Sequence, residues 1–348
     1  MRILFVAPVT FDRGTLFISQ YVTGLARAAQ ALGHEVRLVQ STESMYNPKV
    51  WKFLAAEYRT ARRYLRALVD LPHDLMLRGQ IRREVDEFEP DVVFFHFLDT
   101  SYMDRAIPVF RKKGRRLIAW CGVHPAEVSI GVQRFLRALD LVLIYDASYI
   151  SDFRRLGIDR LFVIPLGCDP ARFDCIEPDE EYRAVNGVEV CFVGIFDEHR
   201  AKYLNMITNT ALGIWSWNMQ EYDTPLRRFY RGTIYGDELT RIYKSSKIVL
   251  NIHREFEKSG GNYRLFEIAA CGSFQLVDDR KDIANYFDIG REVVTFASEQ
   301  DLRDKVHYYL DHRDERIKIA HAGYERVKKD HTLLDRMRRI VHRLQEMP

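Results

Sequence analysis

The sequence predicts an α/β protein made of two doubly wound, Rossmann-like domains, and three observations lead to this expectation. The length of 348 residues fits two domains of about 150 residues each. An apolar strand, helix, strand alternation opens the chain and starts again near Val188, which is typical of parallel sheets. Between the two series, residues 174–187 are polar and acidic, as interdomain linkers often are. We therefore expect domains at residues 1–173 and 188–325.

Composition excludes several classes of protein. The chain has 52 Lys and Arg against 49 Asp and Glu, so its near-neutral charge predicts no nucleic-acid partner. The 5 cysteines are scattered without a C-x-x-C pair, which predicts neither a zinc site nor a disulfide framework. Reduced, buried thiols in a cytoplasmic protein are the simplest account. The apolar run Ile3–Val9 is too short for a signal peptide or a membrane-spanning helix.

The first domain is expected to open with a strand, a helix and a second strand, at Arg2–Pro8, Leu16–Leu32 and Glu35–Val39. Gly33 is a suitable helix stop. Parallel sheets bind ligands at the carboxyl ends of their strands, so the loop Val9–Thr15, with Gly14, is expected at a binding edge. This loop lacks G-x-G-x-x-G, which disfavours a nicotinamide-dependent dehydrogenase.

A long basic region follows, predicted to be helical over residues 46–88 and carrying Lys and Arg between residues 49 and 83. Apolar side chains are interleaved with the charges. A basic amphipathic helix can lie on anionic lipid or hold an anionic acceptor. A solvated helix face packed on the domain is the simpler interpretation. Peripheral contact with the inner face of a membrane therefore stays open for an otherwise cytoplasmic protein.

Further strands are predicted at Pro90–His96, Arg116–Trp120, Leu141–Tyr145 and Leu161–Asp169. His96 ends one of these strands, and His124 follows the next one. Because parallel strands end at one edge of a sheet, we expect both histidines on the same rim. A purely structural role is the alternative for each of them.

The second domain is organised around residues 251–279. Its strands are predicted at Val188–Val193, Leu212–Trp217, Lys247–Asn251 and Phe274–Val277, and the chain is predicted to be helical from Leu302 on. Gly260 and Gly261 precede Asn262, a suitable N-cap for a short helix over Tyr263–Ala270. Such a helix start can bind an anion. Arg264 in the first turn opposes the helix dipole, a cost that a bound anion would offset. The alternative is a simple ion pair with Glu267.

Residues 264–272, Arg-Leu-Phe-Glu-Ile-Ala-Ala-Cys-Gly, resemble the nucleotide-sugar signature of retaining glycosyltransferases with the GT-B fold, most of all the CgeB-like branch. In that family two glutamates are separated by seven residues, and the second holds the nucleotide ribose. Glu267 matches the second glutamate, whereas Ser259 stands where the first is expected. The family often has an arginine after the glycine that ends the strand, and a lysine six residues after that glycine. Here Ile195 follows Gly194, and Arg200 takes the lysine position.

The resemblance implies two Rossmann-like domains with a central cleft, and a last helix, residues 326–348, that returns to the first domain. It implies transfer of a sugar from a nucleoside diphosphate sugar to an acceptor of unknown kind, a glycan, a lipid-linked molecule or a protein. It further implies retention of configuration, with neither a metal nor another cofactor.

The implied site residues follow from the same resemblance. The catalytic candidates are His124, Arg200 and Arg264. The donor-binding candidates are Glu267, Gly260, Gly261, Asn262, Tyr263, Gly14, and, near the base, Tyr235 and Gly236. His96 and Ser259 are further candidates for the cleft. Because Ser259 and Ile195 depart from the family pattern, a catalytically weak module that binds a nucleotide or scaffolds a partner is the alternative.

Overall fold

The computed structural model describes residues 1–7, 9–12, 15–18, 20–40, 82–96, 107–108, 110–122 and 124–347. The chain forms two compact units. Unit 1 comprises Met1–Pro165 and Met337–Pro348, and unit 2 comprises Leu166–Arg336. Gly14 and residues 49–81 of the basic region lie outside the described residues. The last two basic residues of that region, Arg82 and Arg83, are exposed on a helical segment, residues 82–88.

Unit 1 contains a parallel sheet with the strand order β4-β1-β5-β6-β7-β8. Its strands are β1 (Arg2–Ala7), β4 (Glu35–Gln40), β5 (Val92–His96), β6 (Arg116–Cys121), β7 (Leu141–Ile144) and β8 (Leu161–Val163). Phe5 in β1 lies opposite Leu38 on one side and Phe94 on the other. The near-continuous apolar runs suit a sheet covered on both faces. The expected strands are therefore confirmed, although β8 ends six residues before Asp169.

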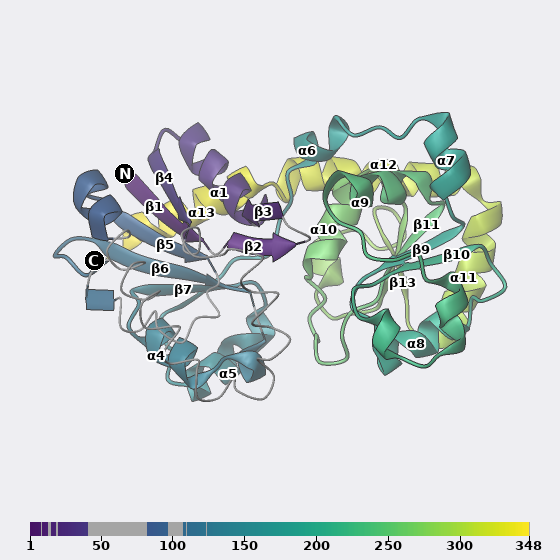
Figure 1. Cartoon of the computed structure of the whole chain (residues 1–348), viewed down its shortest axis with the longest axis horizontal. Coiled ribbons are helices and arrows are strands. Elements are labelled where there is room, and N and C mark those ends of the chain that lie inside the picture. Colours follow the sequence, from purple (N-terminus) through teal and green to yellow (C-terminus); the bar gives the residue numbers. More distant parts are fainter. Residues whose placement is uncertain are drawn as a thin grey trace, which may run out of the picture. The chain divides into compact units, whose positions relative to one another are not determined.

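Helices cover both faces of this sheet. They are α1 (Gln20–Ala31), α4 (Ile130–Arg137), α5 (Ile150–Arg155), the short η1 (Pro125–Glu127) and η2 (Ala147–Tyr149), and the C-terminal α13 (Leu333–Glu346). Figure 1 shows α1 and α13 along one side of the sheet, and α4 and α5 along the other. Gly33 has φ +80°, which confirms it as the residue that stops α1.

The expected helix from Leu16 is wrong at its beginning. Thr15–Ile18 forms strand β3, which pairs antiparallel with β2 (Val9–Asp12). Both segments are rich in β-branched and aromatic residues, which suit a hairpin. The helix that the apolar spacing predicts forms only from Gln20 on.

Unit 2 contains a second parallel sheet, with the order β10-β9-β11-β12-β13. Its strands are β9 (Val190–Val193), β10 (Leu212–Trp215), β11 (Ile248–Asn251), β12 (Gln275–Asp278) and β13 (Val294–Phe296). Alternate residues point to opposite layers of the core. Val190 and Phe192 pack in one cluster, and Cys191 and Val193 pack in the other.

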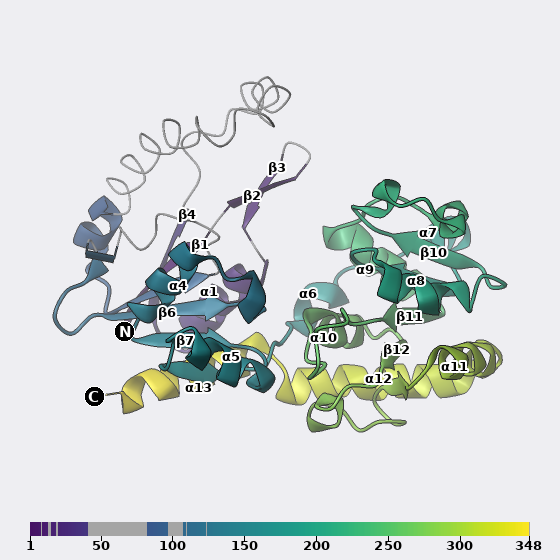
Figure 2. The ribbon, with the colours of Figure 1, turned by 90° about the horizontal axis from the view of Figure 1, so that it is seen from below.

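The helices of unit 2 are α6 (Pro170–Asp174), α7 (Glu180–Asn186), α8 (Glu198–Asn205), α9 (Gly236–Ser245), α10 (Tyr263–Ala270), α11 (Glu299–Asp311) and α12 (Arg313–Asp330), with the short η3 (Met219–Glu221), η4 (Pro225–Phe229) and η5 (Ile283–Asn285). The long helix α12 packs on α10, as Figure 2 shows. The limits of α10 are those expected from the sequence.

The segment expected to be a linker, residues 174–187, lies within unit 2. Asp179 caps α7 there by accepting a hydrogen bond from the backbone N–H of Tyr182. The Tyr182 hydroxyl donates to Glu238 in α9 over 2.8 Å, and Arg183 donates to the carbonyl of Lys244. These contacts attach the polar segment to α9, so its composition reflects an exposed helix rather than a free connection.

The chain enters and leaves unit 2 at neighbouring positions. The Arg336 guanidinium donates to the carbonyl of Leu166 from Nε at 3.2 Å and from Nη2 at 3.1 Å. Its Nη1 donates to the carbonyl of Asp330 at 3.0 Å. The backbone N–H of Cys168 donates to the carbonyl of His331 at 2.9 Å. The first and last residues of unit 2 are thus fastened to each other.

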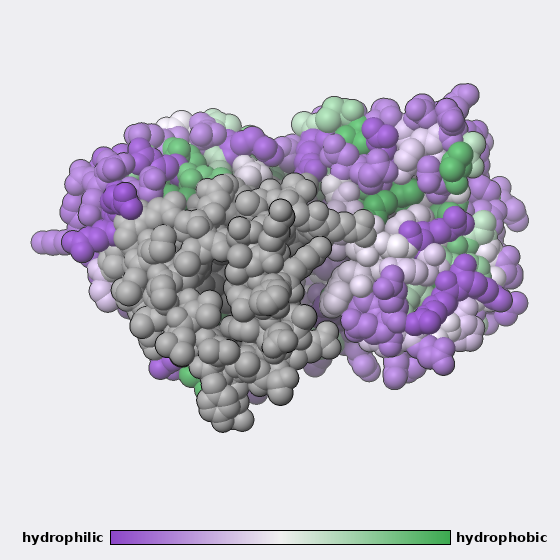
Figure 3. Space-filling view, viewed as in Figure 1, coloured by the Kyte–Doolittle hydropathy of each residue, from purple (hydrophilic) through white to green (hydrophobic). Residues whose placement is uncertain are grey.

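The visible surface of unit 2 is mostly hydrophilic, with separate apolar patches between the charged residues (Figure 3). In the part of the chain that the structure describes, no helix is long and apolar enough to cross a membrane.

Candidate active site

A pocket of about 220 Å³ lies at the carboxyl ends of β9 and β11. Its walls are the ends of these strands, the residues that follow them, and the first turn of α10. The strands β10 and β11 lie on opposite sides of β9, so the strand order reverses at this point. Doubly wound sheets bind ligands where their strand order reverses. The pocket therefore stands where the topology alone would place a site.

Arg200 forms part of the pocket wall and is held by the surrounding backbone. Its side chain is only 9% exposed. Nε donates to the carbonyl of Ile252 at 2.9 Å, and Nη1 donates to the carbonyl of Ile195 at 2.8 Å. Burial lowers the pKa of Arg200, while Asp197 and Glu257 oppose that effect. The guanidinium stays charged at neutral pH, and its Nη2 has no hydrogen-bond partner among the described residues.

Asn262 connects the end of β11 to the start of α10. Its carbonyl oxygen accepts from the backbone N–H of Leu265 at 2.9 Å, which confirms the expected N-cap. The same side chain exchanges two hydrogen bonds with Asn251, at 3.1 and 2.9 Å. Because Asn251 is buried, this amide pair fixes the first turn of α10 against the sheet. Asn262 and Tyr263 both line the pocket.

Arg264 lines the pocket. It also forms the ion pair with Glu267 that was the alternative to anion binding in the interpretation of the sequence. Its Nη1 donates to the Glu267 carboxylate one turn further along α10. Burial works against its charge, but neighbouring Tyr243 and Glu267 raise the pKa of Arg264 above its ordinary value. The side chain of Glu267 is 9% exposed and that of Arg264 is 32% exposed. Glu267 itself is not part of the pocket wall.

Contacts within the protein explain why residues 260 and 261 are glycines. Gly260 has φ +92°, and a Cβ there would lie 2.4 Å from the Cβ of Arg280. A Cβ on Gly261 would lie 3.1 Å from the ring of Tyr286. Buried Ser259 accepts from the backbone N–H of Asp282 through its carbonyl, at 2.9 Å. The two glycines thus allow this part of the loop to pack on residues 280–286, and neither Ser259 nor the two glycines line the pocket.

Sequence reasoning missed Arg254 and the network behind it. Arg254 lines the pocket and follows His253, which is fully buried. The Nδ1 and the backbone N–H of His253 both contact Oδ1 of Asp278, at 2.6 and 2.9 Å. The Nε of Arg280 donates to the other carboxylate oxygen at 2.8 Å. A cation three residues beyond Asn251, the last residue of β11, was the available signal.

Asp278 is therefore a buried acceptor for His253 and Arg280. Burial acts to raise the pKa of Asp278, but His253 and Arg280 hold it below its ordinary value. Within the described ranges, no three His, Cys, Asp or Glu side chains cluster as metal ligands would.

The two histidines of unit 1 have different neighbours. His124 caps η1, since its Nδ1 accepts from the backbone N–H of Ala126 at 3.2 Å. The neutral ring therefore carries its proton on Nε2. His96 ends β5, and burial lowers its pKa to about 4. Its ring lies 6.3 Å from that of Tyr21, whereas the ring of His124 lies 5.0 Å from that of Tyr149.

Tyr235 and Gly236 mark the start of α9. Tyr235 takes the N-cap position, and its side chain is exposed. Gly236 has φ +59°, and a Cβ there would meet no atom within 4 Å. Neither residue belongs to the wall of the pocket at β9 and β11.

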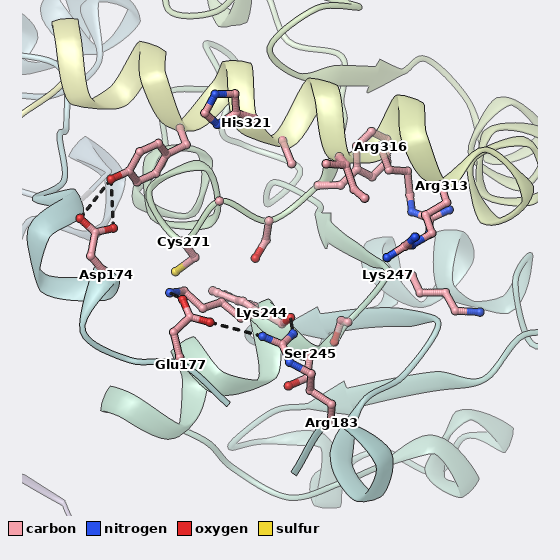
Figure 4. A pocket seen from close by; sticks show the side chains of 18 residues that line it. Asp174, Glu177, Arg183, Lys244, Ser245, Lys247, Cys271, Arg313, Arg316 and His321 are labelled. Atoms are coloured by element: carbon pink, nitrogen blue, oxygen red, sulfur yellow. Dashed lines mark hydrogen bonds and ion pairs between the residues drawn. The ribbon is translucent and has the colours of Figure 1, made fainter. Parts of the chain in front are cut away.

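A larger pocket, of about 560 Å³, lies at the opposite edge of the sheet of unit 2. Its wall includes Lys247 and Phe274, which precede β11 and β12. Figure 4 shows Glu177 pointing toward Lys244 and Arg183. Glu177 forms ion pairs with both, at 2.5 and 3.3 Å. Because these charges are paired within the protein and the strands start here, this pocket does not resemble a catalytic site.

Comparison with known proteins agrees with this architecture. Residues 18–172 match the family described as Glycosyltransferase Family 4, and residues 197–342 match the family described as Glycosyl transferase-like. The chain is 19% identical to the spore protein CgeB of Bacillus subtilis (strain 168) over 268 residues, which is 70% of this chain and 79% of CgeB.

Solved structures show the same fold. HepE from Anabaena, solved in complex with UDP and glucose, has a TM-score of 0.65 at 11% identity, over 100% of both chains. A glycosyltransferase from Rickettsia africae has a TM-score of 0.65 at 13% identity, over 99% of this chain and 98% of that one.

Two parallel-sheet α/β units, with a pocket where the strand order of the second unit reverses, define a protein of the GT-B fold. The two family matches identify the chain further, as a member of the family 4 glycosyltransferases with a distant likeness to CgeB.

Proposed function

We propose that this glycosyltransferase moves a sugar from a nucleoside diphosphate sugar to an acceptor, with retention of configuration and without a metal. The observation that carries the proposal is the pocket at β9 and β11, whose wall contains Arg200, Arg264 and the start of α10. A cationic pocket beside a helix N-terminus suits a diphosphate. HepE, which has the same fold, has been solved with UDP-glucose.

The reaction breaks the bond between the anomeric carbon and the diphosphate oxygen, and the diphosphate leaves with the electron pair. The acceptor oxygen then bonds to the anomeric carbon, and its proton passes to the departing diphosphate. Positive charge develops on the sugar, and negative charge develops on the leaving group. The main task of the protein is to neutralise the leaving diphosphate with preorganised donors, a role we assign to Arg200 and Arg264.

The remaining donor contacts are assigned by the family resemblance and by the chemistry of each side chain. Glu267 accepts from the ribose hydroxyls, since only one of its oxygens is engaged by Arg264. Backbone near Tyr235 and Gly236 contacts the base. His124 donates to the donor sugar from Nε2, because its Nδ1 is already an acceptor.

The decisive experiment is a thermal-shift panel of nucleoside diphosphates and nicotinamides, followed by a donor-hydrolysis assay on the compound that stabilises the protein most. We expect stabilisation by one nucleoside diphosphate, UDP being the first to test, and slow release of its sugar. Stabilisation by a nicotinamide instead would overturn the proposal. Nucleotide binding without any turnover would favour a second candidate, a catalytically weak binding module. The departures from the family pattern at Ser259 and Ile195 support that candidate.

A further inference from the structure

Arg254 is a third arginine in the wall of the pocket at β9 and β11, beside Arg200 and Arg264. It is half-buried, and its guanidinium carbon lies 5.5 Å from the ring centroid of Phe256. A guanidinium resting on an aromatic face loses little freedom when it binds a further group.

The backbone that carries Arg254 is fixed on three sides. The carbonyl of Ile252 accepts from Nε of Arg200 at 2.9 Å. His253 is bound to Asp278 through its ring and its backbone. The backbone N–H of Arg254 donates to the Glu257 carboxylate at 3.0 Å, and its carbonyl accepts from the N–H of Glu257 at 3.0 Å. One rigid segment therefore positions Arg254 and also holds Arg200.

The three arginines in the wall of the pocket have different charged neighbours. Arg264 has a carboxylate partner one turn away, Glu267. Arg200 has its Nε and Nη1 committed to carbonyls, and Asp197 lies 3.8 Å from Nη1. The charge of Arg254 is close enough to Arg200 to contribute to lowering the pKa of Arg200. The wall contains these three arginines and one carboxylate, Glu257, so its excess of positive charge favours an anionic ligand with more than one negative charge.

We propose that Arg254 binds the diphosphate of the donor together with Arg200, and so supplies the charge that is missing at Ile195. This assignment rests on the proposed function and adds a residue to it. Ile195 contributes only its carbonyl, which accepts a hydrogen bond from Arg200. Arg254 lines the same pocket from the segment that follows the neighbouring strand β11.

The test is calorimetric titration of the full chain with three ligands. They are inorganic pyrophosphate, the nucleoside diphosphate that stabilises the wild type most in the thermal-shift panel, and the corresponding nucleoside. The variants are Arg254→Ala and Arg254→Gln. The matched control is Arg291→Ala, since Arg291 is 83% exposed on the same unit and, among the residues that the structure describes, forms an ion pair with Asp288 alone. We expect Arg254→Ala to weaken diphosphate and pyrophosphate at least tenfold, with nucleoside affinity within about twofold.

Arg254→Gln should give the same selective loss, and it serves where the alanine variant fails to fold. Arg291→Ala should bind all three ligands as the wild type does. If the wild type binds the nucleoside diphosphate and the Arg254 variants bind it equally well, the inference fails while the proposed function stands. Equal losses of nucleoside and diphosphate would show a structural role and overturn the inference. If the wild type binds no nucleoside diphosphate, the proposed function fails and the inference fails with it.

Discussion

The Nδ1 of His253 lies 2.6 Å from the carboxylate of Asp278, and both side chains are buried where β11 and β12 end. A carboxylate only accepts hydrogen bonds, so the proton of the neutral ring resides on Nδ1. The Nε2 of the same ring is buried and has no partner among the described residues. The pair joins two neighbouring strands directly behind Arg254, so the stability of this edge and the shape of the pocket depend on one carboxylate.

Asp278→Asn should lower the free energy of unfolding by about 1–3 kcal/mol, because His253 loses its charged acceptor and Arg280 loses its counter-ion. The pKa of Asp278 is lowered in the folded state. The stabilisation is therefore complete above the unfolded pKa, about 3.9, and is lost as the pH falls through the lower folded value. Urea titrations at pH 7 and at several acidic pH values measure both effects. A wild type and a variant of equal stability at pH 7 would contradict this role.

Glu267→Gln should weaken binding of the nucleoside diphosphate by about tenfold, since a charged hydrogen bond to the ribose contributes roughly 1.5–3 kcal/mol. Calorimetry with the nucleoside and the diphosphate measures the loss, which should be similar for both because both contain ribose. The substitution also removes the counter-ion of Arg264, so the free energy of unfolding has to be measured beside it. Unchanged nucleoside affinity in a folded variant would rule out the ribose contact.

His124→Ala should reduce turnover more than nucleotide affinity, because the side chain is proposed to act on the sugar. Its cap on η1 would be lost as well, at a cost of about 1 kcal/mol. His124→Asn is the matched control, since asparagine also caps helices but cannot replace the Nε2 donor. Comparing kcat and Kd for the three proteins separates the two roles. Recovery of full turnover by the asparagine variant would mean that His124 is only a cap.

Arg200→Ala and Arg264→Ala should each weaken diphosphate binding by about 1.5–3 kcal/mol while binding of the bare nucleoside changes little. The double variant should lose less than the sum, because both residues are proposed to grip one leaving group. Arg200→Ala also leaves the carbonyls of Ile252 and Ile195 without their donor, so unfolding curves are required for every variant. Equal losses for nucleoside and diphosphate would leave Arg264 as the partner of Glu267 alone.

The regular elements could be predicted wherever the local signals agree. At α10 a strand end, two glycines, an N-capping asparagine and a Cys-Gly stop follow one another, and the structure has the same limits. At Leu16 the signals conflict, because the apolar residues of β3 continue the spacing of α1 in register. Only pairing with Val9–Asp12 decides for a strand, and such pairing is not visible in a short window.

The candidate site was predicted in part for the same reason. Arg200, Asn262, Tyr263 and Arg264 stand near glycine turns and a helix start, which are local features, and they share one pocket. The position of Arg254 depends on the His253–Asp278 pair, whose two residues are 25 positions apart in the sequence. The reason for Gly260 is equally remote, because the atom that excludes a side chain there belongs to Arg280.

The contact between Arg336 and Leu166 makes unit 2 an insertion whose two ends are already tied together. Closing this segment into a loop costs entropy, and that cost is met when the contact between Arg336 and Leu166 forms. The cost does not depend on the rest of the chain. Leu166–Arg336 should therefore be separable as a continuous recombinant fragment with its own core. Every residue that lines the pocket at β9 and β11 lies between these two junctions, so we expect the fragment alone to keep the proposed donor site.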